Sequence, residues 1–375
     1  MKHLLFLINL CLSFSCASQT QEKRDTLSTE SALSSFSSDT LQLLFVGDLM
    51  QHQGQINAAR TATGYDYSTC FEYVEKEIKQ ADFSIANLEV TLGGKPYTGY
   101  PAFSAPDEFL TGIKAAGFNV LVTANNHSLD RGAKGLERTV QLLDSFQLAH
   151  TGVFINPEER ERSVPLILEK KGFRIALLNY TYGTNGIVVT PPNIVNYIDT
   201  TIIARDIEKS ISLSPDAIIA CMHWGDEYKS LPNKEQVFLA DWLLSKGVSH
   251  VIGSHPHVVQ PIEVRQDSLT NDKHLVVYSL GNFISNMSAR RTDGGLMVRM
   301  ELVKDSTTRL SKCEYSLVWT ARPVQSGRKN HQLLPVNLPI DSIPLNARNS
   351  LKIFTNDART LFNRHNKGIN EYTFY

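Results

Sequence analysis

Short apolar runs recur along this chain, and each of them ends in a polar or glycine-containing turn. Runs this short and this apolar are typical of strands that are buried on both faces of a sheet. We therefore predict strands over residues 41–46, 83–86, 120–124, 175–178, 217–221, 250–252 and 274–278.

Helical patterns lie between several of these runs. We predict helices over residues 67–80, 107–116, 135–146 and 235–246. The last is the clearest, because its apolar residues recur at helical spacing. Strands that alternate with helices indicate a layered α/β domain. After Leu296 the pattern predicts a strand pair, an irregular proline-rich segment and a closing helix over 349–363, with Asn349 or Ser350 as its N-cap.

The composition is that of an ordinary globular protein. The 375 residues are 42% apolar and 20% charged, which is enough to bury a sizeable core in one large domain or two modest ones. The formal net charge is -1 and no block of like charge occurs. This balance gives no reason to expect nucleic acid as a partner.

The N-terminus has the pattern of an export segment. A short basic start precedes an apolar stretch over residues 4–14, and small residues then precede Cys16. The stretch is too short to span a bilayer but suits a cleaved signal. It resembles a loose bacterial lipobox, so we predict a lipoprotein signal over 1–16 with Cys16 as the lipid-modified residue. The alternative is a plain secretory signal in which Cys16 is incidental.

A polar segment follows the predicted signal. Residues 17–40 are rich in Ser, Thr, Gln and Glu and have few large apolar residues, so we expect a disordered tether. We assign 41–300 to the main domain and 301–375 to a C-terminal extension packed on it. Three further cysteines, at positions 70, 221 and 313, are spaced too widely for a disulfide framework or a clustered zinc site. We expect buried small hydrophobic residues, with room for one bridge.

Polar residues of ligand type follow the predicted strands where they end. Asp48 comes after Gly47 at the end of the first run, and Glu89 follows the second run together with Asn87. Each signal is weak alone, since Gly-Asp is a common turn dipeptide. In open α/β sheets, however, sites form in the crevice beyond the carboxyl ends of the strands.

The third run ends in an unusual sequence, Asn125-Asn126-His127. Amides and imidazoles directly after a buried strand are costly without partners. Capping of the next helix would account for one asparagine but hardly for all three residues, so this pattern favours a functional role.

Histidines end two more runs. His223 closes one, and His255-Pro256-His257 follows another. Two histidines one residue apart project to the same side of an extended segment, which makes a good metal chelate. Oxygen and imidazole ligands together suit Mn, Fe or Zn, and the lack of a cysteine cluster argues against a structural zinc.

These segments resemble the motif series of the CapA (PGA_cap) family of capsule or poly-γ-glutamate synthesis proteins. The resemblance covers roughly residues 41 to 300 in the expected order. The matching motifs are Gly47-Asp48, Asn87-Leu88-Glu89, Ala124-Asn125-Asn126-His127, His223-Trp224-Gly225-Asp226-Glu227, Ser254-His255-Pro256-His257 and Ser279-Leu280-Gly281-Asn282-Phe283.

The resemblance implies a fold and a set of roles. The family is similar to calcineurin-like metallophosphoesterases, which implies a four-layer α/β/β/α sandwich holding one or two divalent ions. Asp48 and His257 would bind the first metal, and Glu89 would take the bridging position. Asn126, His223 and His255 would hold the second metal. His127 would be the general acid that protonates the leaving group.

The chain departs from that pattern at two positions. The metallophosphoesterase pattern has Asp-x-His at the first site, whereas here the nearest histidine is His52, either a substitute ligand or an ordinary exposed residue. The bridging position carries Glu89 instead of Asp. Further possible ligands or pocket residues are Asn125, Glu227 and Asn282.

Three functional hypotheses follow. The first is an envelope-anchored metal-dependent hydrolase that acts on a phosphoester or an envelope-polymer bond in capsule or poly-γ-glutamate-type synthesis or export. Its partners would be an anionic envelope polymer or phosphoester substrate and, through the lipid anchor, the membrane. The second is a non-catalytic envelope scaffold or polymer-binding protein with a vestigial metal site. The third, a cytoplasmic nucleotide phosphatase, is disfavoured by the export segment.

Overall fold

The computed structural model describes residues 39–375, which form one compact unit. The predicted signal, Cys16 and the tether up to residue 38 lie outside the described residues. The first strand begins at Asp39, so the last two residues of the predicted tether, 39 and 40, belong to that strand. None of the helices in the described part of the chain combines the length and apolar character needed to cross a bilayer.

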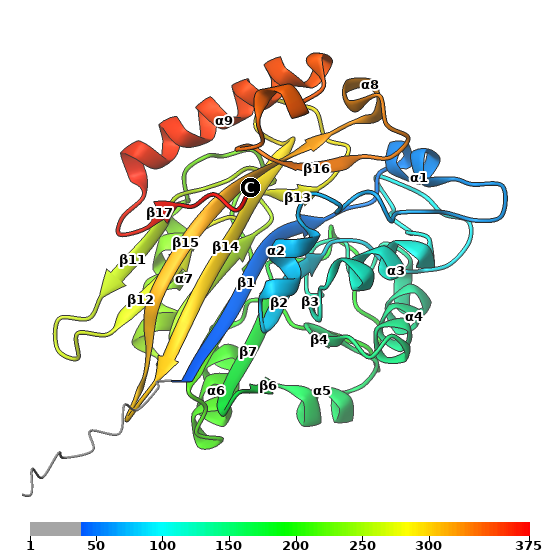
Figure 1. The fold of residues 1–375 in the computed structure, drawn as a ribbon. Helices are drawn as coiled ribbons and strands as arrows, with labels where there is room; N and C mark the ends of the chain where they lie inside the picture. The colour runs from blue at the N-terminus through cyan, green and yellow to red at the C-terminus, as the bar shows by residue number, and fades with distance from the viewer. Residues whose placement is uncertain (1–38) are drawn as a thin grey trace, which may run out of the picture. The chain divides into compact units, whose positions relative to one another are not determined.

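The larger sheet has nine strands. They are β1 (Asp39–Leu49), β2 (Phe83–Leu88), β3 (Val120–Val122), β4 (Ala149–Thr151), β13 (Asn282–Ile284), β14 (Gly294–Lys304), β15 (Thr308–Ala321), β16 (Gln332–Pro335) and β17 (Asn370–Glu371). Their order is β16-β15-β14-β1-β2-β3-β4, with β13 beside β1 and β17 beside β15 (Figure 1). The residues after 300 therefore supply strands of this sheet.

The smaller sheet has six strands. They are β6 (Leu166–Lys170), β7 (Phe173–Thr181), β9 (Ala217–His223), β10 (His250–Ser254), β11 (Ile262–Gln266) and β12 (Lys273–Val277). Their order is β11-β12-β10-β9-β7-β6. A separate short pair joins β5 (Val153–Phe154) to β8 (Ile194–Val195). All seven predicted strands are present in one sheet or the other.

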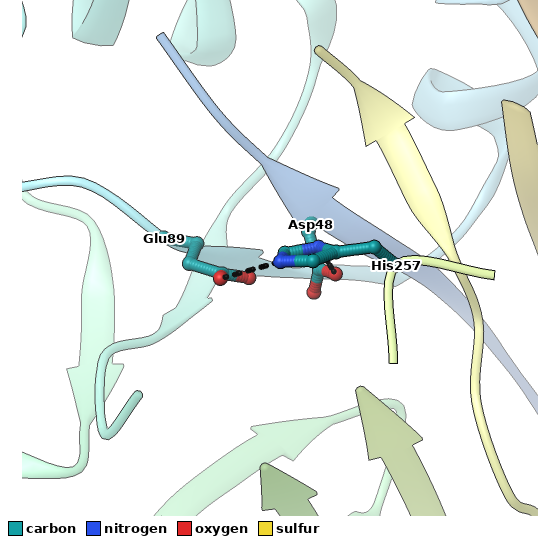
Figure 2. Close-up of side chains that lie close together, drawn as sticks. All are labelled: Asp48, Glu89 and His257. Atoms are coloured by element: carbon teal, nitrogen blue, oxygen red, sulfur yellow. Dashed lines mark ion pairs between the residues drawn. The ribbon is translucent and has the colours of Figure 1, made fainter. Parts of the chain in front are cut away.

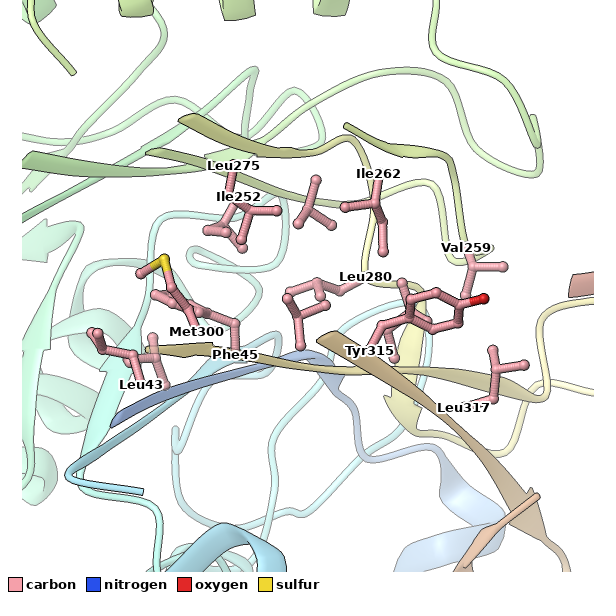
Figure 3. Close-up of a cluster of buried hydrophobic side chains, with 14 of the residues drawn as sticks. Leu43, Phe45, Ile252, Val259, Ile262, Leu275, Leu280, Met300, Tyr315 and Leu317 are labelled. Atoms are coloured by element: carbon pink, nitrogen blue, oxygen red, sulfur yellow. The ribbon is translucent and has the colours of Figure 1, made fainter. Parts of the chain in front are cut away.

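The two sheets pack face to face around the central core. Leu43 and Phe45 of β1 point toward Ile252 and Leu275 of the smaller sheet (Figure 3). The alternate residues of the same strands, such as Leu44 and Val46 of β1, lie in a second cluster on the outer face of the larger sheet. Successive side chains of a strand point to opposite faces, so burial of both faces explains why most positions in these runs are apolar.

Most helices of the described chain cover the outer faces, whereas the last one adds its buried side chains to the central core. They are α1 (Gln53–Ala59), α2 (Glu75–Gln80), α3 (Asp107–Ala116), α4 (Gly132–Ser145), α5 (Pro157–Ser163), α6 (Thr200–Ser212), α7 (Lys234–Ser245), α8 (Pro323–Ser326) and α9 (Leu345–His365), with a 3₁₀ turn at Ile340–Ser342. The buried face of α3 packs on the larger sheet, and α6 and α7 pack on the smaller one. The predicted order of layers, helix–sheet–sheet–helix, is confirmed.

Two predicted helices differ from the structure. Only the second half of the 67–80 prediction is helical, because residues 67–74 form successive turns that bury Cys70, Phe71 and Val74 at the same apolar spacing. The Cys70 carbonyl accepts a hydrogen bond from the Leu333 N–H of β16, so this carbonyl bonds to the sheet and not within a helix. The closing helix begins after Pro344, so the predicted N-cap at Asn349 or Ser350 was wrong.

The cysteines of the domain are free thiols. Cys70 and Cys221 are buried and Cys313 is half-buried, and no disulfide joins them in the part of the chain that the structure describes. They pack as small hydrophobic residues, as expected.

Candidate metal centre

The predicted site residues converge at one edge of the sandwich. Strands β1, β2 and β3 are parallel neighbours in the larger sheet, and β9 and β10 are parallel neighbours in the smaller sheet. Their carboxyl ends meet, so residues that are far apart in the chain are brought together there.

The backbone before Asp48 requires glycine. A Cβ atom on Gly47 would lie 1.8 Å from the carbonyl oxygen of Gly281, so β13 can approach β1 only because that side chain is missing. The Asp48 N–H donates to the same carbonyl at 3.0 Å. This close approach fixes the direction in which the Asp48 carboxylate leaves the strand.

Asp48, Glu89 and His257 form the tightest group of ligand atoms (Figure 2). One atom from each lies within 4.8 Å of the other two. His257 Nδ1 is 3.4 Å from Asp48 Oδ2, and His257 Nε2 is 3.8 Å from Glu89 Oε1. All three side chains are buried. The group meets the requirement for holding a metal ion.

The buried negative charge of this group favours a bound cation. Burial, followed by the charge of Asp48, raises the pKa of Glu89 well above its ordinary value. Burial lowers the pKa of His257, but its contacts with Asp48, Glu227 and Asn282 together outweigh burial and the net shift is upward. Asp48 Oδ2 and Glu89 Oε1 have no hydrogen-bond partner although they are buried. Two buried carboxylate oxygens left unpaired beside one another fit a site for a divalent ion.

A second group of predicted ligands adjoins the first. His223 Nε2 lies 2.8 Å from Asn126 Oδ1 and 3.9 Å from Glu89 Oε1, and the rings of His223 and His255 are 4.8 Å apart. Burial lowers the pKa of His223 well below its ordinary value, and burial with the charge of His257 lowers that of His255 to about 3. Both imidazoles are therefore neutral at pH 7, which is the form that binds metals. His255 Nδ1 is buried without a partner, as a ligand atom would be.

The segment that carries His255 and His257 is not extended. The backbone φ angles of these two residues are 102° and 58°, in the region that non-glycine residues rarely adopt. The expectation of an extended segment was wrong, yet the two rings lie 6.0 Å apart and face the same group. Such strained backbone persists where the surrounding structure holds it, and it is concentrated at functional sites.

His127 stands beside the ligands with its own partner. Its Nδ1 lies 2.7 Å from Asp130 Oδ2, which also accepts a hydrogen bond from the Phe103 N–H. The Phe103 ring packs against the imidazole with the ring centroids 4.6 Å apart. When Nδ1 carries a proton directed at Asp130, Nε2 is left to exchange a proton with a substrate.

The remaining predicted residues have supporting positions. Asn125 Nδ2 donates to the Leu88 carbonyl at 2.8 Å, which joins the turns after β2 and β3. Asn282 Oδ1 lies 3.0 Å from His257 Nδ1, so it orients that ring with Nε2 toward Glu89. Glu227 is partly exposed, and its Oε1 is 4.0 Å from His257 Nε2.

His52 is the N-cap residue of helix α1. Its Nδ1 lies 3.3 Å from Gln55 Oε1 and 3.4 Å from the Asn286 N–H. It is half-buried, not exposed, and it packs edge-on against Phe103, 5.2 Å between ring centroids. It lies outside the tight ligand group.

Sequence reasoning did not assign roles to three residues of the site. Asn87 Nδ2 lies 2.8 Å from Asp48 Oδ1, 3.1 Å from Glu89 Oε2 and 3.3 Å from His223 Nδ1. Its position two residues before Glu89 was the available signal. Asp130, three residues after His127, lay within the motif already noted. Tyr182, whose ring centroid is 4.5 Å from that of His255, had no signal in the sequence.

An open cavity of about 450 Å³ adjoins these residues. It is lined by Tyr100, Pro101, Ala102, Asn126, His127, Asp130, Asn185, Ile187 and Glu227. The proposed acid and one proposed metal ligand therefore face space that could accommodate a substrate.

Comparison with known proteins identifies relatives of the chain. Residues 42–287 match the family described as "Bacterial capsule synthesis protein PGA_cap". The chain is similar to "Capsule biosynthesis protein CapA" of Bacillus anthracis, 27% identical over 281 residues, 72% of this chain and 66% of that protein. It is also similar to "PGA biosynthesis protein CapA" of Bacillus subtilis (strain 168), 27% identical over 293 residues, 73% and 71% of the two chains. The chain thus spans just under two thirds of the first relative's length. Among solved structures, NAD nucleotidase (NadN) of Haemophilus influenzae aligns with a TM-score of 0.47 and 9% identity, over 90% of this chain and 58% of that one.

Proposed function

Because the chain belongs to the bacterial capsule synthesis protein PGA_cap family, we propose that it is a divalent-metal-dependent hydrolase of the cell envelope. Its substrate would be a phosphoester or an envelope-polymer bond in the synthesis or export of a capsule or poly-γ-glutamate-type polymer. The names of its relatives support the capsule role, and the geometry of the site supports hydrolysis.

One observation carries the proposal. Three buried polar atoms of the predicted ligand set have no partner, namely Asp48 Oδ2, Glu89 Oε1 and His255 Nδ1. Unpaired buried polar atoms cost stability, and a bound cation would satisfy them together. Asp48 and His257 would hold one ion, with Glu89 between the two groups. Asn126, His223 and His255 would hold a second. Carboxylate, amide and imidazole donors favour Mn, Fe or Zn.

The chemistry follows from the placement of these side chains. Divalent ions supply Lewis acidity, which polarises the scissile centre and makes water nucleophilic near neutral pH. The chain itself supplies the proton for the leaving group. His127 faces the cavity, and Asp130 holds its Nδ1 so that Nε2 can deliver the proton.

His127→Ala tests the catalytic part of the proposal. We expect kcat toward a generic phosphodiester to fall by about 100-fold or more, because the leaving group loses its proton donor. Metal content, measured on the same purified protein, should stay at the wild-type level, since His127 is outside the tight ligand group. His365→Ala, an exposed histidine on α9, is the matched control.

Two outcomes would contradict this assignment. Unchanged kcat in His127→Ala would remove the residue from the reaction, and loss of metal would make it a ligand. Normal polymer assembly by the variant would favour the alternative of a non-catalytic scaffold. That alternative has one observation in its support, because His223 Nε2 and Asn126 Oδ1 already satisfy each other at 2.8 Å.

The envelope location is the second part of the proposal. We expect processing of the export segment and lipid attachment at Cys16, which would hold the domain at a membrane through the polar tether. Incorporation of labelled palmitate should be seen in the wild-type chain and be lost in Cys16→Ser, while Cys11→Ser, a cysteine of the same segment, should still be labelled. Equal labelling of wild type and Cys16→Ser would leave the plain secretory signal as the better explanation.

A further inference from the structure

Exposed tyrosines gather around the metal centre. The described part of the chain has four tyrosines among its exposed large hydrophobic residues, and three of them, Tyr100, Tyr182 and Tyr228, surround the site. Their exposed fractions are 74%, 48% and 54%. We refer to these three as the tyrosine rim. Tyr375, the fourth, lies near the chain's end and contacts Tyr73.

Each member of the rim adjoins a different part of the site. Tyr182 packs against His255 at 4.5 Å between ring centroids and Tyr228 lies 6.2 Å from His257. Tyr100 lies 6.3 Å from Phe103, the ring that packs on His127. A group bound over the ligands and the acid would therefore meet aromatic surface on several sides.

Beside the His127 imidazole and the Tyr100 hydroxyl, the polar side chains of the cavity are amides and carboxylates. Asn126, Asn185, Asp130 and Glu227 line it, and no lysine or arginine occurs among its described lining residues. Basic residues do line a cavity elsewhere in the described chain, since Arg299 and Lys312, with three glutamates, line one of about 260 Å³ on the larger sheet. A chain of carboxylates would place negative charges beside Asp130 and Glu227, and the described lining has no lysine or arginine to balance them.

This combination fits an uncharged ring that bears hydroxyl groups. The faces of tyrosine rings pack on apolar ring surface. Carboxylates accept hydrogen bonds from hydroxyl groups, and side-chain amides both accept and donate them. We infer that the substrate carries a neutral sugar ring next to the bond that is broken, and that this ring lies against the tyrosine rim. The inference rests on the proposed function, because it names the substrate class of the same site.

Binding of a sugar without a scissile bond tests recognition separately from hydrolysis. The probe is methyl β-glucopyranoside, added to the Mn²⁺-loaded domain and followed by saturation-transfer NMR. We expect binding by the wild type and about tenfold weaker binding by Tyr100→Ala, through loss of one aromatic contact. Tyr100→Phe keeps the ring and should bind as the wild type does. Tyr375→Ala is the control for the loss of an exposed tyrosine. An oligomer of γ-linked glutamate should not displace the sugar.

Kinetics with two phosphomonoesters separate this inference from the proposed hydrolysis. Glucose 1-phosphate should have a KM about tenfold below that of glycerol 1-phosphate, and Tyr100→Ala should remove the difference. Sugar binding without turnover of either ester would uphold recognition of a sugar ring at the tyrosine rim and contradict the hydrolase. Turnover of both esters with equal KM, no sugar binding, or displacement by the glutamate oligomer would overturn the inference and leave hydrolysis standing.

Discussion

Replacement of His257 by alanine is expected to remove the bound metal and to reduce hydrolysis to the background rate. His257 Nε2 faces Glu89 Oε1, and its ring belongs to the tight ligand group with Asp48. Loss of the imidazole leaves two buried carboxylates without the neutral donor that completes the coordination. Metal content of the purified domain and phosphodiester turnover are the two measurements.

Asn282→Ala supplies a graded comparison. This side chain orients the His257 ring from outside the tight ligand group and also donates to the Thr292 carbonyl, so we expect metal affinity to weaken by roughly 10–100-fold without being abolished. His52→Gln serves as the control, because His52 is a nearby histidine engaged at the start of α1. Full metal content in His257→Ala, or equal losses in His257→Ala and His52→Gln, would refute the assignment of His257 as a ligand.

Acidification from pH 7 to pH 5 should destabilise the metal-free domain by about 4 kcal/mol through His250 and His331 alone. Both are buried outside the ligand group, and burial lowers the pKa of His250 to about 3 and that of His331 to about 4. His250 Nδ1 also accepts a hydrogen bond from the Leu275 N–H, which a protonated ring could not do. The pKa of each is depressed in the folded state, so the unfolded chain takes up protons first as pH falls below about 6.5. Stability is therefore complete above that pH and is lost toward the folded-state values, at about 2 kcal/mol for each histidine by pH 5.

The measurement is the free energy of unfolding in urea at both pH values, with chelator present so that metal binding does not contribute. The variants are His250→Asn, which keeps an acceptor for Leu275, and His331→Gln, which keeps a donor for Asn286. Their combination should remove most of that 4 kcal/mol from the difference between pH 7 and pH 5. His365→Asn is the control for the loss of an imidazole as such. An unchanged difference in the double variant would show that these two groups are not responsible.

The strands and the position of the site could be predicted from the sequence because both depend on local pattern. The run 41–46 is apolar on both faces in the sequence and is buried on both faces in β1. Asp48, Glu89, Asn126, His223 and His257 each follow such a run, and parallel neighbours place their ends at the same edge. The family resemblance added the pairing of the two sheets, which no local pattern contains.

The parts that could not be predicted depend on contacts between distant segments. The apolar spacing of residues 67–74 fits a helix, but β16 takes the Cys70 carbonyl and turns bury the same side chains. Asn87 is central only because Asp48, Glu89 and His223 surround its amide. The left-handed backbone at His255 and His257 is imposed by its surroundings and not by residue type.

The ligands are divided between the two sheets, and this has a consequence for the order of folding. Asp48 and Glu89 leave the larger sheet, whereas His223, His255 and His257 leave the smaller one. A molecule in which only one sheet has formed holds carboxylates or imidazoles but not both, and cannot retain a transition-metal ion in this geometry. The ion can therefore bind only after the two sheets have docked. Metal binding would stabilise the assembled domain late in folding and would not nucleate folding.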